Sequence, residues 1–161
     1  MPEKKFNVLF VCLGNICRSP LAEAIFAKKI SDLQLTDHIG TDSCGTGNYH
    51  IGDQPDPRTR AVAEKYGIPI NHRCRQLTKS DENDFDMVIA MDESNRKNIL
   101  WKIGESIRPK VWKMRAFDPE GGDDVPDPYH GDHKDFEIVY SMLDRCTDKL
   151  IEKIKKEINI T

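Results

Sequence analysis

The chain has 161 residues, with 24 lysines and arginines against 27 aspartates and glutamates, a formal net charge of −3 and 38% hydrophobic residues. This length suits one domain over residues 1–161, and such a domain buries enough surface to fold without metal or disulfide staples. The mixed charge argues against nucleic-acid binding, and no apolar run is long enough to predict a membrane span. Five cysteines, an odd number without regular spacing, favour reduced thiols and a cytoplasmic location.

The first elements predicted along the chain are a strand, a loop and a helix. Residues 5–12 hold a continuous apolar run, which is typical of a strand buried on both faces. Residues 13–18 are predicted to form a loop, because Gly14 and Asn15 both tolerate positive φ. Apolar residues then recur at helical spacing over 19–33, which predicts a helix.

The rest of the chain alternates shorter strands with helices. We expect strands at 38–43, 86–91 and 110–115, and helices at 58–66, 93–102 and 134–158. Gly67 is expected just past the second helix and Asp92 to cap the third, while 110–115 alternates apolar with basic residues and should be an edge strand. The pattern predicts an α/β fold, with a central four-stranded parallel sheet and helices on both faces. Ligands in such sheets bind beyond the C-terminal ends of the strands, where loop 13–18 lies.

The loop after the first strand has the features of an anion site. Ser19 is a good N-cap and Pro20 suits a first helical position, so a helix N-terminus should close the loop and aim amides and a positive dipole at one point. Cys12 stands at the rim of this loop, where a neighbouring guanidinium and a helix N-terminus favour the thiolate. Arg18 can hold two oxygens of a tetrahedral dianion with its planar fork. The pattern indicates a phosphate-binding loop in which Cys12 attacks phosphorus.

A C-x5-R spacing alone also fits a buried structural cysteine and an arginine that caps a turn. The strand before it, Gly-Asn within it and Ser-Pro after it favour the catalytic interpretation. The segment from Cys12 to Pro20 resembles the signature loop of the low-molecular-weight protein tyrosine phosphatases, and the resemblance extends over nearly the whole chain. It implies metal-independent hydrolysis of phosphotyrosine proteins or small aryl phosphates, without a cofactor, and phosphate binding by Leu13, Gly14, Asn15, Ile16, Cys17 and Arg18.

A candidate acid lies in the stretch 117–131, which is rich in Pro, Gly and Asp. Asp127 stands between two prolines that restrict its backbone, and a long loop without regular structure is more often functional than idle. From the residues alone a solvated turn aspartate is the favoured alternative, because Asp-Pro is a common turn pair. The resemblance implies instead that Asp127 is the general acid, which protonates the leaving phenol and then activates water.

The resemblance also implies a wall for the substrate ring, formed by Leu13, Ile16, Tyr49 and Tyr129. Aromatic walls favour a stacked phenyl ring, although Tyr49 also fits a partly buried loop anchor. The chain departs from the family at His130, where members often carry a second tyrosine that is phosphorylated in some of them. Regulation of the activity by phosphorylation at position 130 is therefore not expected here.

Further residues are implied to support the loop. Asn15 is expected in a left-handed conformation and, by the resemblance, in a polar network with Ser19, Ser43 and His72. Ser19 can also donate to the thiolate and ease its departure. Cys17 is implied to trap the oxidised nucleophile as a reversible disulfide, because a reactive thiolate oxidises readily.

The residues argue against a metal site and against several other functions. His130, Asp132 and His133 are close in sequence, but they have no second ligand pair at zinc spacing, so no metal site is expected. An arsenate reductase would need relay cysteines, and none lies between Cys74 and Cys146. A phosphate-reading module would lack the nucleophile, the arginine or the acid, whereas candidates for all three are present in this chain. A phosphocysteine carrier of sugar transport needs no acid, so Asp127 argues against that alternative. We expect a monomer.

Overall fold

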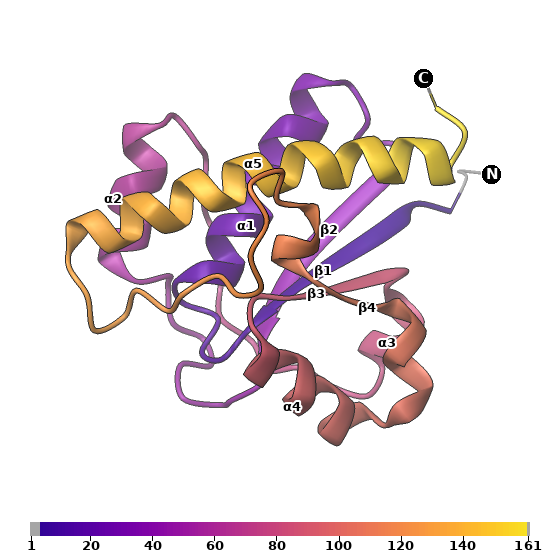
Figure 1. The fold of residues 1–161 in the computed structure, drawn as a ribbon, viewed down its shortest axis with the longest axis horizontal. Helices are drawn as coiled ribbons and strands as arrows, with labels where there is room; N and C mark the ends of the chain where they lie inside the picture. The colour runs from indigo at the N-terminus through magenta and orange to yellow at the C-terminus, as the bar shows by residue number, and fades with distance from the viewer. Residues whose placement is uncertain (1–3, 161) are drawn as a thin grey trace.

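The structure is a computed structural model that describes residues 4–160. Its elements alternate as the sequence predicts (Figure 1), with η marking 3-10 helices. In chain order they are β1 (Phe6–Cys12), α1 (Arg18–Asp32), β2 (Ile39–Gly45), α2 (Pro57–Lys65), α3 (Asp81–Asp84), β3 (Met87–Ala90), α4 (Glu93–Ile103), η1 (Glu105–Lys110), β4 (Val111–Lys113), η2 (Met114–Phe117) and α5 (His133–Glu157).

The four strands form one parallel sheet in the order β2-β1-β3-β4. Strand β1 pairs with β2 from Phe6 opposite Ile39 to Cys12 opposite Gly45, and with β3 on its other side. The predicted four-stranded parallel sheet is therefore confirmed, with β4 at an edge as expected. This order places the end of β1, and the loop that follows it, in the middle of the sheet.

The two faces of β1 bury different helices. Val8 and Phe10 pack in one apolar cluster with residues of α1 and α5, whereas Leu9 and Val11 pack in a second cluster with Ile99 of α4. Figure 1 shows the same division, with α1, α2 and α5 on one side of the sheet and α3 and α4 on the other. Helices on both faces are thus confirmed, and they follow from the alternation of side chains along a strand.

Several boundaries differ from the predicted ones. Strand β2 runs two residues further, to Gly45, because Gly45 N donates to Arg75 O (2.9 Å) and Gly45 O accepts from Leu77 N (2.8 Å). The predicted strand 110–115 is shorter, since the chain turns at Met114 into η2 and buries that side chain. Helices α3, η1 and η2 were not predicted, because elements of four to six residues carry little periodicity.

The helix ends show which capping predictions hold. Gly67 follows α2 at φ 69°, as expected for a residue just past a helix C-terminus. The Asp92 side chain accepts from Asn95 N, as expected for an N-cap. The prediction of Ser19 as N-cap is wrong, because α1 starts at Arg18 with Cys17 in the cap position. No helix within residues 4–160 is long and apolar enough to cross a membrane.

Candidate active site

The segment of residues 12–18, here called the signature loop, lies at the C-terminal end of β1. Its carbonyl oxygens face outward and accept bonds from surrounding segments: Cys12 O from Thr46 N (2.9 Å), Leu13 O from Gly47 N (2.9 Å), Asn15 O from Cys74 Sγ (2.8 Å) and Ile16 O from Asp56 N (2.8 Å). The amides of residues 14–17 donate to no other group in the described chain, 4–160. With its carbonyls turned away, the loop offers these N–H groups to an anion in front of Cys12.

Two backbone positions give the loop its shape. Asn15 has φ 58°, the left-handed conformation expected for it, which Asn tolerates better than most residues. Gly45 at the end of β2 lies directly under the loop, where a Cβ would be 2.6 Å from Leu13 O. Any larger residue at Gly45 would push the signature loop away from the sheet.

The side chain of Asn15 binds four groups from three segments. Its Nδ2 donates to Ser19 Oγ (2.8 Å) and Ser43 Oγ (3.0 Å). Its Oδ1 lies 2.7 Å from His72 Nε2 and accepts from Arg75 N at 3.1 Å. Because an amide oxygen only accepts, His72 Nε2 must carry a proton. The structure thus brings together Asn15, Ser19, Ser43 and His72.

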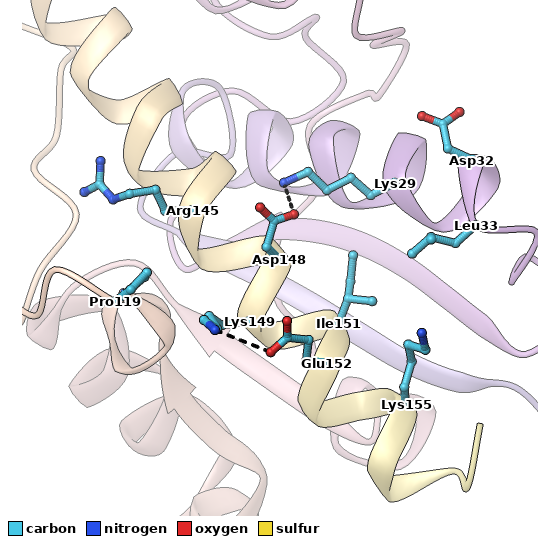
Figure 2. Close-up of a pocket in the computed structure, with 10 residues that line it drawn as sticks. All are labelled: Lys29, Asp32, Leu33, Pro119, Arg145, Asp148, Lys149, Ile151, Glu152 and Lys155. Carbon is cyan, nitrogen blue, oxygen red and sulfur yellow. Dashed lines mark ion pairs between the residues drawn. The ribbon is translucent and has the colours of Figure 1, made fainter. Parts of the chain in front are cut away.

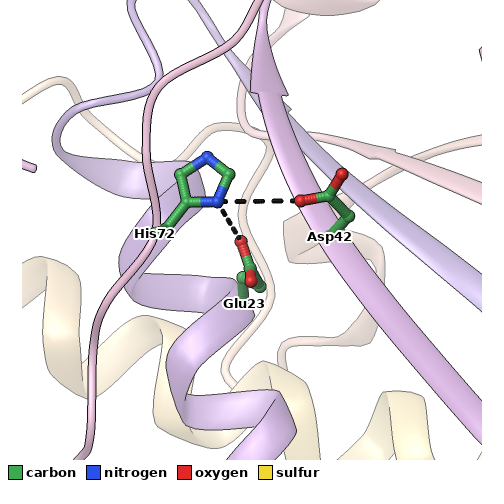
Figure 3. Close-up of side chains that lie close together, drawn as sticks. All are labelled: Glu23, Asp42 and His72. Atoms are coloured by element: carbon green, nitrogen blue, oxygen red, sulfur yellow. Dashed lines mark ion pairs between the residues drawn. The ribbon is translucent and has the colours of Figure 1, made fainter. Parts of the chain in front are cut away.

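Two acidic residues that sequence analysis missed complete this network (Figure 3). His72 Nδ1 lies 3.1 Å from Glu23 Oε1 and 3.6 Å from Asp42 Oδ1, and Glu23 Oε1 also accepts from Ser43 Oγ at 2.6 Å. Burial raises the pKa of Glu23 to about 7 and lowers the pKa of His72. Glu23 follows Ser19 by one helical turn, a spacing that places both on one face of α1 and could have identified it.

Cys12 and Arg18 of the signature loop are both buried. Cys12 Sγ lies 2.9 Å from Ser19 Oγ, so the serine contacts the sulfur instead of capping α1. Arg18 Nη1 donates to Asp92 Oδ2 (2.6 Å) and Val125 O (3.0 Å). Asp92, predicted only as a cap, therefore also fixes the guanidinium and leaves its Nη2 side to face the loop.

Charge around Arg18 keeps it protonated. Burial opposes its charge, but Cys12, Asp92 and Asp127 together raise the pKa of Arg18 above its usual value. Arg18 Nη2 lies 3.7 Å from Asp127 Oδ2, although the two residues are far apart in sequence. The guanidinium thus links the signature loop to the loop that carries the candidate acid.

A cavity of about 480 Å³, here called the active-site cavity, opens in front of Cys12. Leu13, Tyr49 and Tyr129 are exposed at its rim, and the side chain of Asp127 is 45% exposed. Its full lining is Cys12, Leu13, Gly14, Ile16, Cys17, Arg18, Tyr49, His50, Asp127, Tyr129 and His130. His50 was missed as a lining residue because nothing in its local pattern marks it, and His130 packs edge-on against the Tyr129 ring.

The chain between η2 and α5, residues 118–132, is here called the acid loop. Asp127 Oδ1 accepts from Tyr129 N (3.1 Å), which orients the carboxyl group. Arg58 of α2 donates to Tyr129 O (2.9 Å) and Gly131 O (3.3 Å), and Asp56 holds the same guanidinium through Nε and Nη2, both at 3.0 Å. Sequence analysis missed Arg58, since nothing local shows that α2 reaches the acid loop.

The second cysteine of the signature loop lines the cavity but is not a ready nucleophile. Burial, followed by the charges of Asp56, Cys12 and Asp127, raises the pKa of Cys17 to about 12. Cys44, Cys74 and Cys146 are also buried, as expected for ordinary core or loop residues. Cys74 nevertheless supports the loop through its bond to Asn15 O.

A larger cavity, about 620 Å³, lies between α1 and α5 (Figure 2). Most of its charged side chains are paired with each other or with neighbours: Lys29 Nζ with Asp148 (2.8 Å), Lys149 with Glu152 (3.5 Å) and Arg145 with Asp118 (3.1 Å). It has no cysteine, serine or histidine in its lining. The active-site cavity instead combines the amides of the signature loop, the sulfur of Cys12 and the Nη2 side of the Arg18 guanidinium. It is therefore the candidate active site.

Comparison with known proteins agrees with this geometry. Residues 7–160 match the family model described as low molecular weight phosphotyrosine protein phosphatase. A protein of that name from Gallus gallus is 43% identical over 149 residues, covering 91% of this chain and 94% of the relative. A low molecular weight protein-tyrosine-phosphatase from Staphylococcus saprophyticus is 42% identical, with 96% and 97% covered.

Solved structures show the same fold. A crystal structure of a protein tyrosine phosphatase from Entamoeba histolytica superposes with a TM-score of 0.91 at 39% identity, covering 95% of this chain and 99% of that one. The family match spans nearly all of the described residues, including the signature loop and the acid loop. The chain therefore belongs to the low molecular weight phosphotyrosine protein phosphatase family.

Proposed function

We propose that Cys12, Arg18 and Asp127 carry out the phosphotyrosine hydrolysis for which the family is named, in one catalytic domain over residues 1–161. The observation that supports this most is that all three line one cavity, with Arg18 Nη2 3.7 Å from Asp127 Oδ2. A nucleophile, an anion-binding fork and an acid thus lie within reach of one phosphate ester.

In the first step the thiolate of Cys12 attacks phosphorus and the bond from phosphorus to the phenol oxygen breaks. The Nη2 side of Arg18 and the amides of residues 14–17 hold the phosphoryl oxygens, where charge is spread in a loose transition state. Asp127 gives its proton to the departing phenol oxygen. The products are a tyrosine, or another phenol, and a phosphocysteine.

In the second step the carboxylate of Asp127 takes a proton from water, and the water oxygen attacks phosphorus. The bond between phosphorus and sulfur breaks, and Cys12 leaves as a thiolate. A thiolate can only accept a hydrogen bond, so the contact of 2.9 Å with Ser19 Oγ would then be a donation from the serine. That donation stabilises the leaving sulfur.

The rim residues define which esters fit. Leu13, Ile16, Tyr49 and Tyr129 form a slot suited to a flat aromatic ring, which favours phosphotyrosine proteins and small aryl phosphates. We infer a cytoplasmic monomer that uses no cofactor or metal and binds neither nucleic acid nor membrane. The mixed charge and five unpaired cysteines support that inference.

Cys17 is proposed to protect the nucleophile from over-oxidation. Peroxide converts the Cys12 thiolate to a sulfenic acid and releases hydroxide; Cys17 sulfur then attacks the sulfenic sulfur and water leaves as the disulfide forms. A thiol reductant restores both cysteines. The raised pKa of Cys17 should make the second step slow near neutral pH. Peroxide inactivation that is no harder to reverse in Cys17→Ser than in the wild type would argue against this role.

The test is hydrolysis of p-nitrophenyl phosphate and of a phosphotyrosine peptide in the presence of a chelator, across pH. Wild type should be active, Cys12→Ser inactive, and Asp127→Ala should lose about 10²–10³ in turnover. The loss in Asp127→Ala should be larger for the peptide, because tyrosine is a poorer leaving group than p-nitrophenol. A wild-type protein that binds vanadate but hydrolyses neither ester would be a phosphate reader or carrier.

A further inference from the structure

A groove continues outward from the active-site cavity. This side groove, about 500 Å³ in volume, shares Ile16, His50 and Tyr129 with the cavity, so the two lie next to each other. Most of its lining comes from the segment before α2 and from the start of α2, and Arg73 is added from the segment after α2. Two arginines, Arg60 and Arg73, line the side groove but not the active-site cavity.

Arg60 and Arg73 form no direct ion pair with any residue of the described chain, 4–160, although the charge of Arg60 helps to lower the pKa of nearby Asp56. Both arginines are exposed. Arg60 Nε donates to Pro55 O (3.1 Å), which positions the side chain and leaves its two terminal nitrogens free. A positioned guanidinium with free nitrogens suits recognition of a carboxylate or a phosphate.

One of the two carboxylates in the side groove is paired with an arginine. Asp56 Oδ2 lies 3.0 Å from Arg58 Nη2, and against the effect of burial the Arg58 side chain lowers the pKa of Asp56. Asp53 Oδ2 lies 3.4 Å from His50 Nδ1, which carries a positive charge only when it is protonated. Outside the Asp56–Arg58 pair, the side groove therefore holds the negative charge of Asp53 against the positive charges of Arg60 and Arg73.

We propose that Arg60 and Arg73 form an anion subsite for a phosphotyrosine peptide that carries an acidic side chain near its phosphotyrosine. The inference rests on the proposed function of the active-site cavity. An extended peptide advances about 3.3 Å per residue, so a substrate whose ring occupies the cavity can place a side chain a few residues away in the side groove. The ligand is the anionic group, a carboxylate or a second phosphate.

The subsite should act on binding more than on chemistry. Arg60 and Arg73 do not line the cavity that holds Cys12 and Asp127, and contacts between exposed charges are weak and screened by salt. Charges at the rim of an interface mainly change association and its salt dependence. The expected effect is a lower KM for acidic peptides, a nearly unchanged kcat, and no effect on p-nitrophenyl phosphate, which cannot reach the side groove.

The test compares phosphotyrosine peptides in which one glutamate, its glutamine equivalent or a phosphoserine is moved from four residues before the phosphotyrosine to four after it. For at least one position we expect the glutamate peptide to have about three- to fivefold higher kcat/KM than the glutamine peptide at low salt. Arg60→Gln/Arg73→Gln should abolish this difference and leave hydrolysis of p-nitrophenyl phosphate unchanged. The phosphoserine series shows whether carboxylate or phosphate is the better anion.

The control is Lys5→Gln/Lys156→Gln, which removes the same charge from two exposed lysines. Lys5 precedes β1 at the end opposite the signature loop, and Lys156 lies in the last turn of α5. The control should keep the preference for acidic peptides. A preference absent at every position, or one that survives in Arg60→Gln/Arg73→Gln, would overturn the subsite while leaving the proposed function intact. Inactivity towards every ester would overturn both.

Discussion

The signature loop and the acid loop face each other across one cavity, but they are held in different ways. Most of the signature loop is buried, and Asn15 alone binds four groups from three other segments. Most of the acid loop is exposed, and near Asp127 it is held by the side chains of Arg18 and Arg58. Both loops are irregular, so the difference lies in burial and in how many hydrogen bonds fix the chain around Asn15 and around Asp127.

This contrast matches the two tasks proposed for the loops. Binding a dianion requires amides and a guanidinium that are already in position, because reorganising them during the reaction would raise the barrier. Donating a proton requires one carboxyl group that can approach the leaving oxygen and then a water molecule. We therefore expect changes in the signature loop to affect both folding and rate, and changes near the acid to affect rate with little loss of stability.

The largest effect on rate is expected from Arg18→Lys. A lysine keeps the charge but cannot bind Asp92 and Val125 with one nitrogen and the phosphoryl group with another. We expect kcat to fall by about 10³, since losing a single oxyanion donor already costs 10²–10³. Steady-state kinetics with p-nitrophenyl phosphate measures this, and a loss below tenfold would show that point charge alone is sufficient.

Asn15→Ala should reduce both stability and rate. The change removes the bonds to Ser19, Ser43 and His72 and leaves alanine at φ 58°, so we expect about 3 kcal/mol of lost stability and about 10² in kcat. Gln34→Ala is the matched control, because Gln34 also has a positive φ, 59°, but is exposed and outside the site. If both variants lose equal stability by urea unfolding, the hydrogen bonds of Asn15 contribute little.

The comparison of the loops also explains what the sequence could reveal. The signature loop was predictable because its parts are adjacent: a strand, a Gly-Asn pair, a cysteine and an arginine within one short segment. The sheet and its helices were predictable for the same reason, since hydrophobic periodicity is local. Asp127 needed the family resemblance, because an Asp-Pro pair in a long loop has the ordinary chemistry of a turn.

The residues that were missed act across long sequence separations. Glu23 and Asp42 meet His72 only after α1, β2 and the segment beyond α2 have packed together. Arg58 reaches the carbonyl of Tyr129, 71 positions later in the chain. The misassignment of Ser19 has a related cause, because a serine at a helix start has two possible uses and only the folded site shows which partner is near.

Arg58→Met tests how the acid loop is positioned. Methionine keeps much of the apolar volume near Phe136 but cannot donate to Tyr129 O and Gly131 O. We expect about a tenfold fall in kcat, through misplacement of Asp127, with KM for p-nitrophenyl phosphate little changed.

Two measurements separate this role from a structural one. Arg58→Met should weaken the limb of the pH–rate profile that depends on the acid, and the loss should shrink for esters of more acidic phenols, which need less protonation. Lys65→Met is the matched control, since it removes a cation of α2 that pairs with Glu137, 2.7 Å away, outside the cavity. A loss independent of the leaving group would rule out positioning of the acid.

The smallest effect on rate is expected at the start of the acid loop, where Asp118 is held between two arginines. Its side chain is fully buried, and its carboxylate lies 3.1 Å from Arg115 Nε and 3.1 Å from Arg145 Nη2. Burial opposes ionisation, but the arginines and the amide of Glu120 lower the pKa of Asp118 overall. Asp118→Asn should cost about 2 kcal/mol of stability, because it leaves these cations without their partner, and should lower kcat only a few-fold.

The pH dependence distinguishes this ion pair from ordinary packing. Because the pKa of Asp118 is lower in the folded protein than in the unfolded chain, its charge stabilises the fold above the usual aspartate pKa, and this contribution is lost as pH falls through the folded value. The difference in unfolding free energy between wild type and Asp118→Asn should therefore be constant from about pH 5 to 7 and shrink below about pH 4. Glu120→Gln, which removes an exposed partner of the same Arg145, should show almost no difference at any pH. A difference for Asp118→Asn that does not change with pH would instead assign the loss to packing, and the acid loop would then be anchored at its start by shape and not by charge.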